Sequence, residues 1–280
     1  MGAVAGQSRY NSGMIFSSPG AILFQLGPIT VRWYGAMFAL AFMVTTFFAS
    51  KMAGKRGLDE NAMVNCALLS FIGGILGARL YYVALQWSHF HDHLLEVFAT
   101  WNGGLSIHGG MIGVILFGGI YCFRVKLPYL QMLDILCACI PMGQAIGRWG
   151  NFFNSELFGR PVPANFPLRL FIPAENRPPQ YIGDSYFHPT FLYESLWNLG
   201  IFLLLYYVAA DRLQKYPGMT LFVYLLLYSI GRLLIEPLRT DSIMAGTIQV
   251  PMIASSVCVV IALGGIAFLL VRNRKAKDAN

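Results

Sequence analysis

The sequence of 280 residues is 56% hydrophobic and only 12% charged, with a mean hydropathy of +0.56 and a formal net charge of +7. A soluble domain carries about 25% charged residues, so this composition excludes an ordinary soluble protein. The chain contains no P-loop, no GxGxxG fingerprint and no HExxH pair. Any group transfer therefore has to draw its energy from the donor molecule, and no cofactor is expected.

Apolar runs are the main structural signal, because several approach the ~20 residues that span a bilayer as a helix. In chain order the runs are Trp33–Ser50, Asn61–Leu85, Leu105–Phe123, Leu133–Gly147, Thr190–Ala210, Met219–Ile235 and Ile248–Val271. The fourth is short and must be extended or span only part of the bilayer. The chain start does not resemble a cleavable signal, so the first run is expected to be its own targeting element. The sequence predicts an all-α polytopic membrane protein with about seven transmembrane helices.

Basic residues indicate the orientation of these helices. All the lysines follow span one, three, five or seven, and several arginines join them. These residues are Lys51, Lys55, Lys126, Lys215, Lys275, Lys277, Arg56, Arg124, Arg212, Arg272 and Arg274. Short loops rich in Lys and Arg stay cytoplasmic, so the N-terminus is expected outside and the C-terminus in the cytoplasm. The positive charge is then a topology signal, and no nucleic-acid partner is expected.

Two regions lie outside the predicted spans. Residues 1–32 are punctuated by Pro and Gly and are expected along the outer membrane surface. The stretch Arg148–Pro189 is rich in proline, which predicts a loop-rich external head rather than a long helix. No repeat or low-complexity tract divides the chain. Residues 1–280 are therefore expected to form one membrane domain, with residues 148–189 as its head and motif region.

Neither the cysteines nor the histidines match a disulfide or metal pattern. The five cysteines fall in or beside apolar runs and are odd in number, which favours buried small hydrophobes. His89, His91 and His93 lie close together with Asp92, but their spacing matches no standard zinc site. No metal is predicted.

Polar side chains gather near the outer ends of the predicted spans, where ionisable groups are costly and usually functional or paired. They are Tyr34, Arg79, His108, Arg148, Asn151, His188, Tyr193, Glu194, Tyr228, Arg232, Glu236, Arg239 and Asp241. Scattered structural ion pairs have no reason to share one depth. Three or more arginines against few acids predict an excess of positive charge, for which a lipid phosphate is the natural partner.

Residue spacing adds two hypotheses. Tyr228, Arg232 and Glu236 are four residues apart and so share one helix face, although the Arg232–Glu236 pair alone could be purely structural. His108 is followed by glycines at positions 109, 110 and 113. These allow a neighbouring helix or a substrate to approach an imidazole that could act as a general base toward a thiol.

Several blocks, taken in order, resemble one family. The stretch GRWGNFFNSELFGRP is similar to the defining motif of the bacterial prolipoprotein diacylglyceryl transferases. VRWYG, IHGGMIG, HPTFLYES and GRLLIEPLRTD are similar to that family's other blocks. The resemblance covers the chain from Leu26 to Val271 and is least specific at 161–187.

This resemblance implies a reaction and a location. The sn-1,2-diacylglyceryl group of phosphatidylglycerol would pass to the lipobox cysteine thiol in the signal-peptide region of a prolipoprotein. A thioether would form, and glycerol phosphate would leave. The protein would lie in the bacterial cytoplasmic (inner) membrane as a multi-pass protein, with its active site at the outer leaflet. Because the broken bond joins a glycerol carbon to a phosphate oxygen, the leaving group's charge must be stabilised.

The resemblance also implies residue roles. His108 matches the proposed base, and Arg148, Tyr228 and Arg232 match essential positions. Tyr228 could instead act as the base, or no dedicated base could be needed, and Arg239 could exchange roles with Arg232. The expected phosphatidylglycerol-binding residues are Arg148, Asn151, Arg232, Arg239 and Tyr34, and the expected supporting residues are Arg79, Glu156, Gly159, His188, Glu194 and Glu236.

Two other classes of protein compete with this interpretation. A lipid or anion transporter or scramblase with an outer-leaflet phosphate site would also place arginines in spans. It would, however, need polar groups through the cytoplasmic half, where only Asp134 is an ionisable candidate. A non-catalytic signal-peptide receptor would leave the predicted anion site unexplained.

Overall fold

The structure is a computed structural model that describes residues 13–27, 29–100 and 103–278. Within these residues, seven helices are long and apolar enough to cross a membrane, which confirms the predicted number. They cover Trp33–Lys55, Glu60–Leu85, Ile107–Val125, Tyr129–Asn154, Thr190–Leu213, Met219–Leu238 and Val250–Lys275. The protein is therefore a multi-pass membrane protein that is mostly helical.

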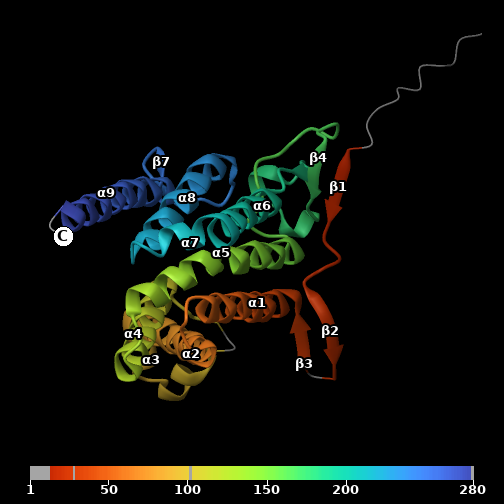
Figure 1. Cartoon of the computed structure of the whole chain (residues 1–280). Helices are drawn as coiled ribbons and strands as arrows, with labels where there is room; N and C mark the ends of the chain where they lie inside the picture. The colour runs from red at the N-terminus through yellow and green to blue at the C-terminus, as the bar shows by residue number, and fades with distance from the viewer. Residues whose placement is uncertain (1–12, 28, 101–102, 279–280) are drawn as a thin grey trace, which may run out of the picture. The chain divides into compact units, whose positions relative to one another are not determined.

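The helices carry the labels of Figure 1. The spans are α1 (Trp33–Lys55), α2 (Glu60–Leu85), α4 (Ile107–Val125), α5 (Tyr129–Asn154), α6 (Thr190–Leu203) continuing through η5 (Leu204–Ala209) and α7 (Ala210–Leu213), α8 (Met219–Ile235) with η6 (Glu236–Leu238), and α9 (Val250–Asp278). The short helices are α3 (Trp87–Phe90), η1 (Leu94–Phe98), η3 (Ala174–Asn176) and η4 (Pro179–Tyr181).

The apolar run underestimates the length of the fourth span more than that of any other span. Helix α5 extends from Tyr129 to Asn154, so Arg148 and Asn151 belong to its last turns and do not follow it. The apolar run ends at Gly147 because polar residues replace apolar ones there, but the helix continues. This corrects the expectation that Arg148 and Asn151 follow the span, whereas the external head at residues 148–189 stays a prediction.

Short strands modify the all-α expectation. Strands β1 (Met14–Ser17), β4 (Leu168–Phe171) and β5 (Tyr186–Phe187) form a small sheet in which β1 is parallel and β5 antiparallel to β4. Two hairpins are formed by β2 (Ile22–Leu26) with β3 (Ile29–Arg32), and by β6 (Met244–Ala245) with β7 (Ile248–Gln249). Strands this short carry too little alternation to be recognised in sequence.

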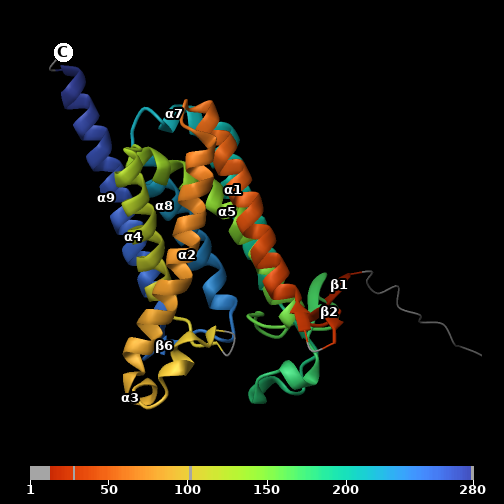
Figure 2. The ribbon, with the colours of Figure 1, turned by 90° about the horizontal axis from the view of Figure 1, so that it is seen from below.

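The chain divides into two compact units. Residues 45–139 form one unit, in which α2 and α4 lie side by side (Figure 2). Gly73 and Gly77 of α2 face Gly113 and Gly109 of α4 so closely that a Cβ on either α4 glycine would overlap an α2 carbonyl. Small residues at this four-residue spacing let the two backbones approach within a membrane.

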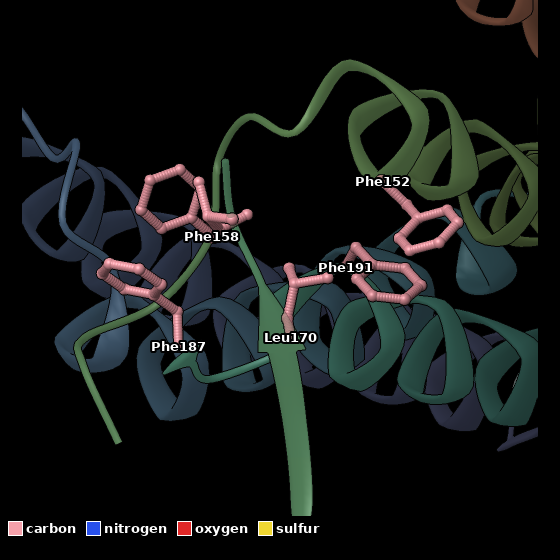
Figure 3. Packing of buried hydrophobic residues seen from close by; sticks show 6 residues of the cluster. Phe152, Phe158, Leu170, Phe187 and Phe191 are labelled. Atoms are coloured by element: carbon pink, nitrogen blue, oxygen red, sulfur yellow. The ribbon is translucent and has the colours of Figure 1, made fainter. Parts of the chain in front are cut away.

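Residues 1–44 and 140–280 form the other unit. A cluster of buried hydrophobic side chains joins the end of α5, the loop after it, the β1–β4–β5 sheet and the start of α6 (Figure 3). Its buried members are Phe152, Phe158, Leu170, Ile172, Phe187 and Phe191. In the same unit α8 packs beside α9 (Figure 1). The hydrophobic cluster fixes the polar loop between α5 and α6 against both helices.

Candidate functional site: an arginine–carboxylate cluster

Glu194 is the centre of the charged groups in the unit formed by residues 1–44 and 140–280. Its carboxylate lies 2.5 Å from the Arg148 guanidinium of α5, 3.3 Å from Arg232 of α8 and 3.2 Å from Arg239, which follows η6. Glu194 is only 3% exposed. We call Arg148, Arg232 and Arg239, with their carboxylate partners Glu194, Glu236 and Asp241, the arginine cluster.

Arg232 and Arg239 each pair with a second carboxylate in addition to that of Glu194. Arg232 of α8 pairs with Glu236, four residues later at the start of η6, which confirms that these two residues share a helix face. Arg239 donates to Asp241 from Nε at 3.1 Å and from Nη2 at 2.7 Å. Burial opposes the charge of Arg239, but the hydrogen bond and charge of Asp241, with Glu194 and Glu236, outweigh it and raise the pKa of Arg239.

The arginine cluster is electrically balanced, which corrects the expectation of excess positive charge. Three guanidiniums face three carboxylates, and the acids come from α6, η6 and the loop after it. The acids were visible in the sequence, but only the fold brings Glu194 between arginines of other segments. An arriving anion must therefore share or replace a carboxylate partner. Arg148 is the best placed for this, since its side chain is 20% exposed against 14% for Arg232 and 7% for Arg239.

Asn151 and Glu156 extend the arginine cluster into the loop after α5. The Asn151 side chain accepts from Arg148 at 3.3 Å and donates to Glu156 at 2.8 Å. Ser155 and Leu157, on either side of Glu156, have left-handed backbones with φ of 53° and 55°. Such a conformation costs a non-glycine residue about 1 kcal/mol or more. The strained backbone at Ser155 and Leu157 thus accompanies the turn that brings the Glu156 carboxylate back to Asn151.

Gly159 joins this loop to the segment that carries Arg239. It forms an antiparallel bridge with Arg239, and its amide donates to the His188 carbonyl at 3.0 Å. A Cβ at position 159 would overlap His188 and crowd Thr190 and the Leu238 carbonyl. Only glycine fits this position without displacing those neighbours.

His188 and Tyr34 take places beside the arginine cluster rather than in it. His188 Nδ1 lies 3.2 Å from the Tyr193 hydroxyl, and burial lowers the pKa of His188. The Tyr34 ring packs against Gly150, where an added Cβ would stand 3.0 Å from the ring. Tyr34 is 45% exposed. Tyr34 thus packs against the motif region, residues 148–189, and His188 lies near the end of that region.

Tyr228 lies one turn before Arg232 on α8, and its ring centroid is 5.9 Å from that of Tyr224. The Tyr224 hydroxyl accepts a hydrogen bond of 2.9 Å from Gln144 of α5. Sequence reasoning did not identify Gln144 or Tyr224. The available signal was their spacing, because each lies four residues before a predicted site residue, Arg148 or Tyr228.

His108 and Arg79 belong to the other unit. His108 is exposed in the first turn of α4, with its ring centroid 6.3 Å from that of Tyr81. Gly109 and Gly113 are in close contact with α2, so these two glycines serve helix packing. The structure does not test the hypothesis that His108 is a base, which stays a prediction.

Arg79 differs from the cluster arginines in its partners. It is 7% exposed and donates to the carbonyls of Val97, Gly103 and Gly104 at 2.8–3.0 Å, and also to that of Glu96. Arg79 therefore holds the loop after η1 in place. Its guanidinium keeps its charge, but four backbone carbonyls use its donors, which favours a structural role.

A cavity of about 740 Å³ opens beside the arginine cluster on the side of the β6–β7 hairpin. Arg160, Arg239 and Gln249 are among the residues that line it. Arg160 is exposed, and its backbone amide donates to the Leu238 carbonyl at 2.6 Å. Arg239 is therefore a member of the arginine cluster that also lines this cavity.

Seven apolar helices among the described residues, and a buried charged cluster contributed by α5, α6, α8 with η6 and the segment after η6, define a polytopic membrane protein with a polar site. The family model of prolipoprotein diacylglyceryl transferase matches residues 21–270. Proteins named phosphatidylglycerol–prolipoprotein diacylglyceryl transferase are 43% identical in Nostoc, 42% in Synechococcus elongatus and 40% in Gloeobacter violaceus. These matches cover 94% of this chain and 94%, 92% and 97% of the three relatives. The chain belongs to the prolipoprotein diacylglyceryl transferase family and is a transferase of that class.

Proposed function

We propose that this transferase moves the diacylglyceryl group of phosphatidylglycerol to the lipobox cysteine of a prolipoprotein, at the outer leaflet of the bacterial cytoplasmic membrane. The new bond joins the cysteine sulfur to the glycerol carbon. The carbon–oxygen bond to the phosphate breaks, and its electron pair leaves with glycerol phosphate. The observation that carries the proposal is the arginine cluster, in which Glu194 gathers three guanidiniums from α5, α8 and the segment after η6.

Arg148 and Arg232 are assigned to the lipid phosphate. They are the two more exposed guanidiniums, and both now contact the same Glu194 oxygen. A phosphate oxygen can take over part of that contact, since guanidinium binds carboxylate and phosphate in the same forked geometry. Asn151 helps to hold Arg148 in position. Preorganised donors of this kind stabilise the charge that develops on the leaving phosphate.

Arg239 is assigned to positioning rather than to the phosphate. Its side chain is 7% exposed and engaged by Asp241 and Glu194. The main-chain bridge to Gly159 ties the same residue to the motif loop. Arg239 then sets where Glu194 lies, and Glu194 sets where Arg148 and Arg232 lie.

The proton of the attacking thiol needs an acceptor. His108 is the proposed base, with Tyr228 as the alternative, because Tyr228 is half-buried one turn before Arg232. Direct ionisation of the thiol without a dedicated base is the third route. A pH–rate profile of His108→Gln and Tyr228→Phe separates the three, since loss of a general base typically costs about 10²–10⁴-fold in rate.

Incubation of the purified protein with phosphatidylglycerol and a lipobox peptide tests the proposal. Mass spectrometry should detect a diacylglyceryl adduct on the peptide. A peptide with serine in place of the cysteine should give no adduct. Absence of an adduct from folded protein, together with flipping of labelled lipid in proteoliposomes, would support the transporter or scramblase alternative instead.

Topology has its own test, designed for N-terminus outside and C-terminus inside. Glu175 and Lys215 are both exposed, and each can be replaced by cysteine in a background in which Cys258, the least buried native cysteine, is alanine. A membrane-impermeant maleimide applied to intact cells should label Glu175→Cys. It should label Lys215→Cys only after permeabilisation. The reverse pattern would overturn the orientation.

A further inference from the structure

The cavity beside the β6–β7 hairpin carries polar groups that the proposed reaction leaves unused. Its described lining residues all belong to the unit formed by residues 1–44 and 140–280. Its volume of about 740 Å³ falls within the range of small-molecule sites, roughly 300–1,000 Å³. Arg239 lines it, and so does Ser242, whose hydroxyl donates to the Glu236 carboxylate at 2.7 Å. The cavity therefore adjoins the arginine cluster both directly and through a hydrogen-bond partner.

Arg160, which also lines the cavity, differs from the cluster arginines because its charge is not balanced. In the part of the chain that the structure describes, its guanidinium makes no hydrogen bond or ion pair, whereas each cluster arginine faces a carboxylate. Its backbone is held, since its amide donates to the Leu238 carbonyl at 2.6 Å and its carbonyl accepts from the His188 amide at 3.0 Å. A fixed segment thus carries an exposed, unpaired cation at a position that lines the cavity.

Two neutral side chains of the β6–β7 hairpin line the same cavity. Thr247 lies in its turn and Gln249 in β7, and among the described residues neither side chain has a hydrogen-bond partner. A hydroxyl and an amide can each donate and accept, which is what an alcohol group needs from its site. A free guanidinium together with free neutral groups fits an anion that also carries hydroxyls.

We propose that this cavity binds the released glycerol phosphate, with Arg160 on the phosphate and Thr247 and Gln249 on the glycerol hydroxyls. This inference rests on the proposed function, which forms that product. Cleavage leaves the electron pair of the carbon–oxygen bond on a phosphate oxygen, so a diester with one negative charge becomes a monoester of about −1.5 to −2 at pH 7. The three guanidiniums of the arginine cluster are already balanced by three carboxylates. The additional charge of the product is therefore best met by the unpaired arginine beside the cluster.

Ligand-observed NMR titrations of the detergent-solubilised, full-length protein test the proposal without turnover. The probes are glycerol phosphate and inorganic phosphate, and the parent should bind glycerol phosphate more tightly. Arg160→Gln should weaken the binding of glycerol phosphate by about three- to tenfold, the effect of one exposed charge-assisted hydrogen bond. Gln249→Leu should lower the preference for glycerol phosphate while leaving the affinity for inorganic phosphate unchanged. Equal affinities of the parent for the two probes would overturn the role of the glycerol hydroxyls.

Arg212→Gln is the matched control, because it removes the same charge from an exposed arginine of α7 that is not among the residues lining the cavity. It should keep the parent's affinities. Weaker binding of glycerol phosphate to Arg160→Gln supports the assignment even if the parent forms no peptide adduct, in which case only the proposed reaction fails. An unchanged affinity in folded Arg160→Gln overturns the assignment. An equal loss of affinity for phosphatidylglycerol also overturns it, because Arg160 would then serve the donor lipid's headgroup instead of the product.

Discussion

Arg79 and Arg148 are both arginines near the end of an apolar helix, yet the fold uses them differently. Arg79 donates to backbone carbonyls of a single loop, and those acceptors are neutral and belong to its own unit. Arg148 pairs with Glu194, which it shares with Arg232 and Arg239. An arginine that holds a loop has no reason to exchange its partners. One that shares a carboxylate can pass part of that contact to a phosphate.

Replacement of the cluster arginines should have the largest effect. Arg148→Ala and Arg232→Ala should each lower the rate of transfer by about 30-fold to several thousand-fold, because loss of a charged contact to a buried phosphate costs about 2–5 kcal/mol. Arg148→Lys should recover little, since the fork geometry is lost. Rates of adduct formation, normalised to folded protein, give the comparison. Near-parent activity in Arg148→Ala would remove the phosphate role.

Arg79→Ala should act on stability instead of on chemistry. The loop carbonyls lose their donor, and the packing against Tyr82 and Phe90 is lost, so we expect a destabilisation of about 1–3 kcal/mol. Thermal unfolding in detergent measures this change. Transfer per folded molecule should stay within a few-fold of the parent rate. A loss as deep as that of Arg148→Ala, at unchanged stability, would show that the two arginines are equivalent.

Neighbouring glycines in α4 give a finer test of the unit that contains Arg79. A Cβ at Gly109 would overlap α2, whereas one at Gly110 would make ordinary contacts of 3.5–3.6 Å. Gly109→Ala should therefore destabilise the protein by about 1–3 kcal/mol, the usual cost of overpacking. Gly110→Ala should be nearly neutral in the same unfolding measurement. If instead Gly110→Ala abolished transfer with stability intact, substrate approach to His108 would again explain the glycines.

His188 should produce the smallest effect, visible only in its pH dependence. Because burial lowers its pKa, the folded protein resists protonation of this imidazole. The stability linked to the neutral ring is complete above the ordinary histidine pKa of about 6.5, and it is lost as the pH falls toward the lowered folded value. The melting temperature of the parent should therefore drop more than that of His188→Gln on acidification across this range. Equal drops would mean that His188 does not contribute.

The sequence predicted the helices well, because the length of an apolar run is set by the bilayer. It failed at the end of α5, where Arg148 and Asn151 end the apolar run but not the helix. Glu194 was expected as a supporting residue, but its place at the centre of three arginines depends on how α5, α6 and α8 meet. Gln144 was missed for a related reason. A single amide in an apolar run does not show its hydrogen-bond partner in the sequence, and the partner, Tyr224, is 80 residues away.

The central claim is that the arginine cluster binds the phosphate of the donor lipid, and a binding measurement tests it most directly. Phosphatidylglycerol and diacylglycerol share their acyl chains and esters, so the difference between their affinities reports the headgroup. The parent protein should bind phosphatidylglycerol at least about tenfold more tightly, as expected for a charge-assisted contact. Arg148→Ala should weaken this preference several-fold although Arg232 remains, while Arg79→Ala should keep the parent's preference. An undiminished preference in folded Arg148→Ala would contradict the account.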